Sequence, residues 1–274
     1  MRIDLHCHST HSDGILPAAE VAARAKDRGV EVFCLSDHDS CEGFEATRAV
    51  FPNAIRGVEL SCTEEGKTVH ILLYGLPGSD WSVVETALTK QREVRRERVH
   101  IIAERLAALG ATLDADAVLE RHKGTVGRPH VAAELVRTGV VASRDEAFSR
   151  FLKDGGPGDV KVSRLTVADG LELAMAAGAR ASLAHPHLQG NRAEPLIARH
   201  REAGLSGLEV HYAIYPAKKR KTWAAMAKRH NMVGTAGSDF HGEGVTSVSK
   251  LGVDVPDDDA ARLLDWLEIS RDAN

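Results

Sequence analysis

The segment Asp4-Leu5-His6-Cys7-His8 opens the chain, and Gly237-Ser238-Asp239-Phe240-His241 stands near its other end. Each segment places two side chains that can bind metal at positions i and i+2. Successive side chains of an extended strand point to opposite faces, so the two histidines of the first segment should share a face. The same holds for the aspartate and histidine of the second. Such faces are costly to bury unless divalent metal ions compensate them, so the two segments predict a metal site.

Length and charge set limits on the class of protein. A chain of 274 residues and 29.5 kDa can bury a substantial core, and α/β barrels of this length are often one domain. A net charge of −4 and a pI near 6.4 give no general electrostatic footprint for long duplex nucleic acid or an anionic membrane. We therefore expect neither as a partner, and local charges must hold any anionic substrate.

The cysteines and the first residues indicate a compartment. Cys7, Cys34 and Cys62 lie in apolar, strand-like runs, and together with Cys41 they form no CxxC pair. Buried free thiols in a reducing compartment are the expected state. The chain opens without an apolar signal segment, and no apolar run approaches the ~20 residues that span a bilayer. These features predict a cytoplasmic protein.

Strand-like and helical patterns alternate along most of the sequence. The strand-like segments are 2–6, 30–36, 55–62, 68–74, 180–185, 207–211 and 232–236. Helical patterns over 18–28, 167–177, 194–203 and 217–230 separate most of them. Strands that alternate with helices favour parallel pairing in an α/β sheet or barrel.

One long stretch departs from this alternation. Residues 81–161 read as almost wholly helical, and the charged run 91–98 interleaves opposite charges as a solvated helix face does. The glycine-rich segment 155–158 predicts a hinge or loop that returns to the main fold. We expect a barrel formed by residues 1–80 and 162–274, with 81–161 as a small helical insertion domain.

Further metal-ligand candidates stand at or near the ends of the predicted strands. They are Asp13, His38, Glu59, His70 and His185. Loops at the carboxyl ends of parallel barrel strands meet at one mouth, so residues spread along the chain can converge there. Taken singly, each candidate could be a turn or core residue. Taken together, the carboxylates would repel one another without cations, and imidazoles with carboxylates suit Zn²⁺, Mn²⁺ or Fe²⁺.

The chain resembles the polymerase and histidinol phosphatase (PHP) family of metal-dependent phosphoesterases. The resemblance runs in the family's order over nearly the whole chain and implies a distorted (β/α)7 barrel with two or three divalent metal ions at its mouth. The motifs that carry it are Asp4-Leu5-His6-Cys7-His8-Ser9, Ser12-Asp13-Gly14, Ser36-Asp37-His38-Asp39, Gly57-Val58-Glu59, His70, Ala184-His185-Pro186 and Gly237-Ser238-Asp239-Phe240-His241.

The resemblance also implies how the ligands are shared among Mn²⁺, Fe²⁺ or Zn²⁺ ions. Asp37 precedes a ligand on the alternate face and would orient an imidazole. The three implied ligand sets are His6, His8, Glu59 and Asp239; Glu59, His70 and His185; and Asp13, His38 and His241.

In the placement of its helical insertion, the chain resembles a subgroup of the family that removes the 3′-phosphate from 3′,5′-bisphosphorylated nucleosides. Some of its relatives trim short RNA from the 5′ end. Gly127-Arg128-Pro129-His130 resembles that subgroup's phosphate-binding segment, with Arg128 as a bidentate grip and His130 beside it. An arginine at the start of a surface helix is the alternative. Gly156 and Asp159 stand where relatives tend to have a lysine and an aromatic residue.

The resemblance implies hydrolysis of a phosphomonoester. A hydroxide held by two metal ions would attack phosphorus in line, and the leaving alkoxide would need a proton donor. His187 and His211 are the donor candidates, although each could equally be a surface histidine. The expected partner is a small phosphorylated substrate, a nucleotide, with short RNA as the alternative.

Three other functions stay open. The same metal site could serve a 5′→3′ exonuclease on short RNA or DNA, because a channel that grips a few nucleotides needs few cations. A phosphatase of the histidinol phosphate type is the second alternative. The third, from a different class, is a non-catalytic sensor of metal or phosphate.

Overall fold

The computed structural model describes residues 1–122, 124–153 and 155–270. Two compact units make up the chain: Met1–Thr86 together with Arg164–Asn274, and Ala87–Ser163. The domain boundaries expected from the sequence, after residues 80 and 161, remain a prediction. Positions 123 and 154 of the expected insertion lie outside the described residues.

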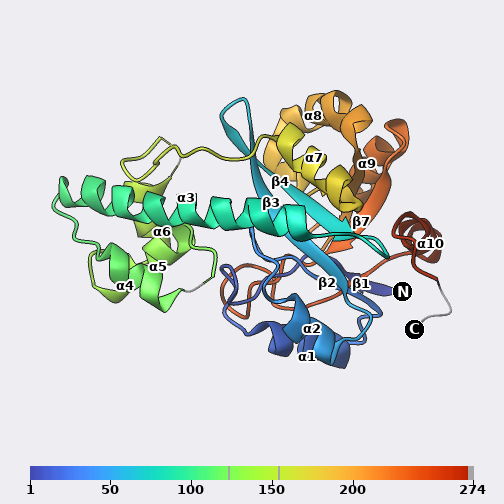
Figure 1. The fold of residues 1–274 in the computed structure, drawn as a ribbon, viewed down its shortest axis with the longest axis horizontal. Helices are drawn as coiled ribbons and strands as arrows, with labels where there is room; N and C mark the ends of the chain where they lie inside the picture. Colours follow the sequence, from blue (N-terminus) through green and yellow to red (C-terminus); the bar gives the residue numbers. More distant parts are fainter. Residues whose placement is uncertain (123, 154, 271–274) are drawn as a thin grey trace. The chain divides into compact units, whose positions relative to one another are not determined.

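A single sheet organises the first unit. Leu5 donates its backbone N–H to Ala236 O at 2.9 Å, and a bridge joins Cys7 to Phe240, so the sheet nearly closes into a barrel. This confirms the distorted α/β barrel. Within the described residues the strand order is β7-β6-β5-β4-β3-β2-β1-β8, with β1 (Arg2–Asp4), β2 (Val32–Leu35), β3 (Ile55–Glu64), β4 (Lys67–Gly75), β5 (Ala179–Leu183), β6 (Leu205–Tyr212), β7 (Val233–Gly237) and β8 (Val253–Asp254) (Figure 1).

The expected parallel pairing holds for β1 with β2, β2 with β3, β5 with β6 and β6 with β7, and three other pairs are antiparallel. β4 runs antiparallel to both β3 and β5, and β8 runs antiparallel to β1. Glu65 and Gly66 connect β3 to β4 with φ values of 52° and 73°, as a two-residue hairpin turn requires. Too few residues separate these strands for a helical crossover, so they pair as a hairpin. β8 has only two residues, so it is too short to produce a periodic pattern in the sequence.

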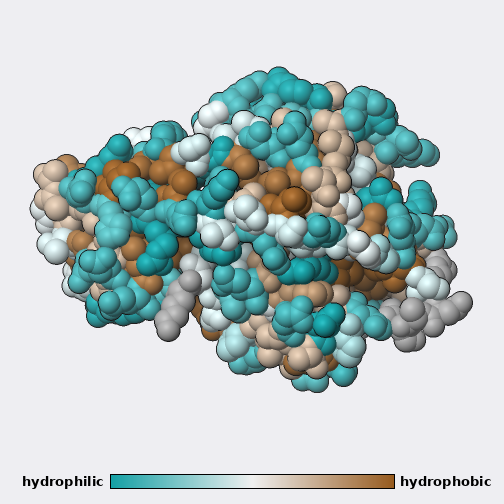
Figure 2. Space-filling model, viewed as in Figure 1, coloured by the Kyte–Doolittle hydropathy of each residue, from teal (hydrophilic) through white to brown (hydrophobic). Residues whose placement is uncertain are grey.

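Helices flank the sheet close to where the sequence predicts them. α1 (Ala18–Asp27), α7 (Val167–Ala177), α8 (Ala193–His200) and α9 (Ala217–Arg229) match the expected ranges, and a 3₁₀ turn, η3 (Arg201–Ala203), extends α8. α7, α8 and α9 lie on one side of the strands, and α1 with α2 (Phe44–Val50) lies on the other (Figure 1). The outer face over α8 is hydrophilic (Figure 2). The remaining helices of this unit are η2 (Pro186–Arg192) and α10 (Asp257–Trp266).

Local signals explain the ends of α7. The Thr166 hydroxyl accepts the N–H of Asp169, whose carboxylate in turn accepts the N–H of Thr166, which forms a capping box. Gly178 ends the helix with φ 66°, a left-handed conformation that glycine adopts without strain. The next residue begins β5, so these caps fix where the strand that leads to His185 starts.

The second unit has its own apolar core. The core includes Ile102, Leu106, Val131, Leu135 and Leu152, all of them almost fully buried. Between 81 and 161, the described residues contain only helices and loops, in line with the helical pattern. The helices are α3 (Ser82–Ala107), which begins in the first unit, α4 (Ala115–Arg121), α5 (Arg128–Arg137), α6 (Arg144–Ala147) and η1 (Phe148–Leu152).

Two expectations about the whole chain can be compared with the structure. Cys7, Cys34, Cys41 and Cys62 are buried free thiols, as the apolar runs predict. Of the helices in the described part of the chain, none is both long enough and apolar enough to cross a membrane.

Candidate metal centre

Glu59, on β3, lies at the centre of a cluster of histidines. Its side chain is fully buried, and each of its two oxygens faces a different group of rings. Oε1 lies 2.9 Å from Nδ1 of His70 and 2.9 Å from Nε2 of His185. Oε2 lies 3.0 to 3.2 Å from the nearest ring nitrogens of three further histidines, His6, His8 and His38.

Asp239 follows β7, the strand that closes the barrel against the segment after β1, and its side chain also reaches the cluster. Its Oδ1 lies 3.4 Å from Nε2 of His6 and 3.2 Å from Nε2 of His8. The ring nitrogens of these two histidines and the two carboxylates, Glu59 and Asp239, therefore enclose one small space. A divalent ion there would have four donor atoms, two nitrogens and two oxygens.

Asp13 forms a third part of the site. Its Oδ1 lies 3.2 Å from Nε2 of His241, and its Oδ2 lies 3.8 Å from Nε2 of His38. His8 borders the same group, because its Nδ1 lies 3.9 Å from Asp13 Oδ1. The structure thus brings all nine predicted ligands to one end of the barrel.

The donor atoms suit divalent metal ions. Five inward-facing atoms are buried and have no hydrogen-bond partner in the described part of the chain: His6 Nε2, His8 Nε2, Asp13 Oδ1, His38 Nδ1 and Glu59 Oε2. Buried polar atoms are rarely left without a partner, and here nitrogen and oxygen atoms converge within 4.8 Å in several groups. Imidazole with carboxylate is the donor set of Zn²⁺, Mn²⁺ and Fe²⁺ sites.

The pKa values show how strongly the cluster is polarised. Burial alone would lower the pKa of His8, but Asp239 and Glu59 outweigh it and raise that pKa to about 10. Conversely, burial would raise the pKa of Glu59, but His38, His6 and His70 hold it well below its usual range. The carboxylates are therefore ionised, and they need cations, whether protons on the rings or metal ions.

Glycine and strained backbone shape the site. A Cβ on Gly237 would lie 2.2 Å from Cβ of His6, so only glycine allows β7 to approach β1 this closely. His185 and Asp239 have positive φ values of 24° and 58°, which are unusual for residues other than glycine. Such conformations concentrate at functional sites, where the surrounding structure holds them in place.

Buried carboxylates hold the loops that carry the ligands. Asp4 accepts hydrogen bonds from the Ser238 backbone at 2.9 Å and hydroxyl at 2.7 Å, which ties β1 to the segment that leads to Asp239. Asp37 accepts from the hydroxyl groups of Ser9 at 2.6 Å and Ser12 at 2.5 Å. The Ser12 hydroxyl also lies 3.3 Å from Nδ1 of His8, so Asp37 is linked to that imidazole through Ser12.

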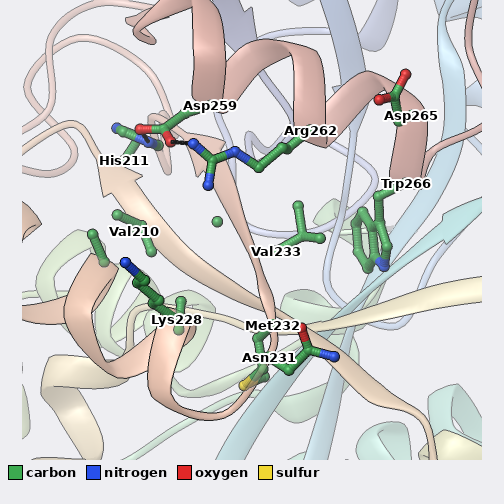
Figure 3. A pocket seen from close by; sticks show the side chains of 13 residues that line it. Val210, His211, Lys228, Asn231, Met232, Val233, Asp259, Arg262, Asp265 and Trp266 are labelled. Carbon is green, nitrogen blue, oxygen red and sulfur yellow. Dashed lines mark ion pairs between the residues drawn. The ribbon is translucent and has the colours of Figure 1, made fainter.

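The two proton-donor candidates lie in different places. The His187 ring lies 6.4 Å from the His185 ring, centroid to centroid, and its Nδ1 lies 2.7 Å from the Tyr215 hydroxyl. His211 lies outside the cluster, in a pocket of about 500 Å³ between α9 and α10, with its Nε2 3.3 Å from Asp259 (Figure 3). The geometry therefore does not support His211 as a proton donor at the metal cluster.

Arg128 and His130 belong to the second unit. Arg128 is the first residue of α5, and its Nη1 donates to the Leu152 carbonyl at 2.9 Å. His130 is buried, and its Nδ1 accepts the N–H of Gly127 at 3.0 Å, which caps the start of the helix. His130 therefore caps α5, whereas Arg128 ties the first residue of α5 to the end of η1. Binding of substrate phosphate by either residue stays a prediction.

Two residues of β6 escaped the sequence prediction. Glu209 lies 2.8 Å from Nδ1 of His6, and the Tyr212 hydroxyl donates to Asp239 Oδ2 at 2.7 Å. Regular alternation from Glu209 places His211 on the inner face and Tyr212 on the outer. The pairing of β6 with β7 shifts register between Glu209 and His211, which reverses this order. A bulge of this kind leaves no clear signal in the sequence.

Comparison with known proteins assigns the chain to a class. Residues 4–103 match the PHP domain family. A 5′-3′ exoribonuclease of Haemophilus influenzae is 34% identical over 248 residues, which cover 88% of this chain and 90% of the relative. A 3′,5′-nucleoside bisphosphate phosphatase of Chromobacterium violaceum is 32% identical over 251 residues, which cover 88% of each chain.

A solved structure agrees with these relatives. A protein of Bifidobacterium adolescentis, assigned as a metal-dependent phosphoesterase, superposes with a TM-score of 0.80 at 27% identity and covers 95% of this chain and 94% of its own. The chain therefore belongs to the PHP domain family of metal-dependent phosphoesterases. It is a hydrolase that acts on phosphoester bonds.

Proposed function

We propose that the protein hydrolyses a phosphomonoester, the 3′-phosphate of a 3′,5′-bisphosphorylated nucleoside. The observation that carries the proposal is the fully buried Glu59 carboxylate, whose two oxygens face separate sets of histidines. Glu59 would help to hold two ions, and a pair of ions would stabilise charge on both the attacking and the leaving oxygen in phosphoryl transfer. The bisphosphate phosphatase of C. violaceum supports this substrate class.

The cofactors in this proposal are two or three divalent ions, Mn²⁺, Fe²⁺ or Zn²⁺. When bound, such ions lower the pKa of water and neutralise charge on the phosphoryl oxygens. The proposed ligand sets are His6, His8, Glu59 and Asp239 for the first ion; Glu59, His70 and His185 for the second; and Asp13, His38 and His241 for the third.

His187 is the better candidate for holding the leaving oxygen, because its ring borders the ligand His185. Burial, the charge of Lys219 and that of His185 lower its pKa to about 4, so the ring is neutral at pH 7. A neutral imidazole can donate a hydrogen bond from one nitrogen while the other contacts the Tyr215 hydroxyl. In this proposal His187 holds the leaving oxygen by a hydrogen bond, and the negative charge of the bound phosphate raises the pKa of the ring so that it supplies the proton that the leaving alkoxide takes up.

A second candidate function has an observation of its own. The H. influenzae relative is a 5′-3′ exoribonuclease and is slightly more similar to this chain than the phosphatase is. The same metal ligands could act on a phosphodiester, with a nucleotide as the leaving group. Short RNA would then be the partner. Membership of a family of phosphoesterases disfavours a non-catalytic sensor. Hydrolysis of histidinol phosphate remains an alternative to be tested.

One substrate comparison tests these proposals. The purified protein, loaded with Mn²⁺, is incubated with 3′,5′-bisphosphorylated adenosine, histidinol phosphate or a short 5′-phosphorylated RNA. We expect inorganic phosphate from the bisphosphate at a kcat/KM at least tenfold above that for the other two. Release of mononucleotides from RNA at the higher kcat/KM would favour the exonuclease. A Glu59→Gln variant purified in parallel controls for contaminating phosphatases, and equal turnover by that variant would contradict the proposed site.

A further inference from the structure

Glu209 is a buried carboxylate, and each of its two oxygens contacts a hydrogen-bond partner. It is on β6, and its side chain is fully buried. Oε1 lies 2.8 Å from Nδ1 of His6, and Oε2 accepts the backbone N–H of His185 at 2.6 Å. One side chain therefore contacts a proposed ligand of each of two ions, and it does so from the side that faces away from the metal space.

This contact selects the proton position on His6. An ionised carboxylate can only accept hydrogen bonds, so Nδ1 of His6 must carry a proton that it donates to Glu209. In a neutral ring the other nitrogen, Nε2, then has a free lone pair. That atom is the one that lies 3.2 Å from Glu59 and 3.4 Å from Asp239, in the space that a metal ion would fill.

Only a carboxylate meets both demands at position 209. A glutamine would offer one accepting oxygen and one donating amide group, while the protein presents two donors, the ring of His6 and the backbone of His185. In either orientation one N–H would face another N–H. If the amide faced His6, the ring would take the other tautomer, and Nε2 would lose its lone pair.

Tyr212 selects an atom of Asp239 in the same manner. Its hydroxyl donates to Oδ2 at 2.7 Å. The other oxygen, Oδ1, lies 3.2 Å from Nε2 of His8 and 3.4 Å from Nε2 of His6. With Oδ2 occupied by Tyr212, Oδ1 is the atom that remains for a metal ion, so Asp239 would bind through one oxygen.

The bulge in β6 lets both residues reach the site. Glu209 pairs with Thr235 of β7, and His211 pairs with the next residue, Ala236, so Val210 is an extra residue in the ladder. Val210 and His211 both line the pocket between α9 and α10, and Figure 3 shows them there. The shift turns Tyr212 inward, to the face that Glu209 occupies.

We propose that Glu209 and Tyr212 are positioning residues that select Nε2 of His6 and Oδ1 of Asp239 as the donor atoms for one metal ion. The inference rests on the proposed function, because it assumes the ligand set given above. It adds that β6, which contributes no ligand of its own, determines which atoms of two ligands face the metal.

The first test is a measurement on the wild-type protein. In the protein loaded with Zn²⁺, long-range ¹H–¹⁵N NMR spectra report which ring nitrogen of His6 carries a proton. We expect a proton on Nδ1 and a metal-bound Nε2. The opposite assignment would overturn the inference even if every variant failed to fold.

The second test compares variants by metal affinity, measured by competition with a chelator. We expect Glu209→Gln and Tyr212→Phe each to weaken binding of the tightest ion by about 10- to 100-fold, the usual cost of losing an outer partner of a ligand. Glu134→Gln removes a buried carboxylate in the second unit, and Tyr215→Phe removes a hydroxyl that contacts His187. Both controls should keep wild-type affinity.

The outcomes separate this inference from the proposed function. If the wild-type protein binds no divalent ion, the proposed ligand set fails and the inference fails with it. If the wild type binds metal and both β6 variants bind it equally well, the inference alone is refuted. If the two control variants weaken binding as much as the β6 variants do, the effect is general destabilisation, and the positioning role is rejected.

Discussion

Replacing Gly237 with alanine should disrupt the metal centre through a single methyl group. The added Cβ would lie 2.2 Å from Cβ of His6, 2.9 Å from Oε1 of Glu209 and 3.0 Å from the His6 backbone nitrogen. Carbon atoms in contact normally lie about 3.5–4.0 Å apart, so the shortfall at His6 is roughly 1.3–1.8 Å. These neighbours are backbone or buried atoms that cannot rotate away, so β1 and β7 must separate.

The expected cost is in stability and in metal binding together. Overpacking of this kind destabilises a protein by about 1–3 kcal/mol, and here it falls on the line where the barrel closes. Separation of the strands also moves His6 away from Glu59. We therefore expect Gly237→Ala to lower the free energy of unfolding by at least about 2 kcal/mol and metal affinity by more than about tenfold.

Gly234 in the same strand provides a matched control. A Cβ there would lie 3.2 Å from Cγ2 of Val210, a tight contact that a shift of a few tenths of an ångström relieves. Replacing glycine with alanine also reduces the entropy of the unfolded chain, which stabilises by about 0.4–1 kcal/mol at compatible positions. Gly234→Ala should therefore change stability by less than about 1 kcal/mol and leave metal binding intact.

Urea unfolding and metal analysis of the two variants give the comparison. We expect a lower midpoint and loss of metal for Gly237→Ala alone. If Gly237→Ala unfolds at the wild-type midpoint and retains its metal, the close approach of β1 and β7 does not shape the site. If Gly234→Ala shows the same losses, the effect belongs to β7 in general.

Three further predictions concern the metal ligands and the second unit. His8→Ala should remove bound metal and turnover together, because both ring nitrogens of His8 face carboxylates of the cluster, and metal analysis with phosphate release checks this. Chelation should abolish hydrolysis, and added Mn²⁺ should restore it; full turnover by metal-stripped protein would contradict a metal-dependent reaction. Hydrogen bonds from Arg137 and Arg121 lower the pKa of Glu134 to about 2, so its contribution to stability is present above its usual pKa near 4.5 and is lost as pH falls toward 2. Wild type and Glu134→Gln should therefore differ most in unfolding midpoint at pH 6, differ less as the pH falls below about 4.5, and converge near pH 2. A difference that stays constant over this range would contradict the ion pair.

The barrel could be predicted from the sequence because its strands and helices alternate with clear periods. Helix α7 even begins and ends at the expected residues, where Thr166 and Gly178 provide strong caps. The antiparallel hairpin of β3 and β4 was not predicted, because a short connection of Glu65 and Gly66 is a local cue that the general alternation outweighed. The direction of a strand depends on its connection, and the apolar pattern is the same in both directions.

The candidate ligands could be predicted because HxH and DxH pairs at strand ends are visible in the sequence. The residues that hold these ligands, Glu209 and Tyr212, could not be predicted. They face the site together because Val210 is an extra residue in the pairing of β6 with β7. The same extra residue directs His211 into the pocket between α9 and α10, away from the metal cluster. Sequence periodicity identifies a face of a strand, and a bulge changes that face without changing the composition.

We propose that the two oxygens of Glu59 bind two different metal ions. Anomalous diffraction from crystals grown with Mn²⁺ or Zn²⁺ tests it most directly. We expect one ion at Oε2 with His6, His8 and Asp239, and another at Oε1 with His70 and His185. An occupied site that leaves Glu59 uncoordinated, or a single ion bound by both of its oxygens, would contradict the claim.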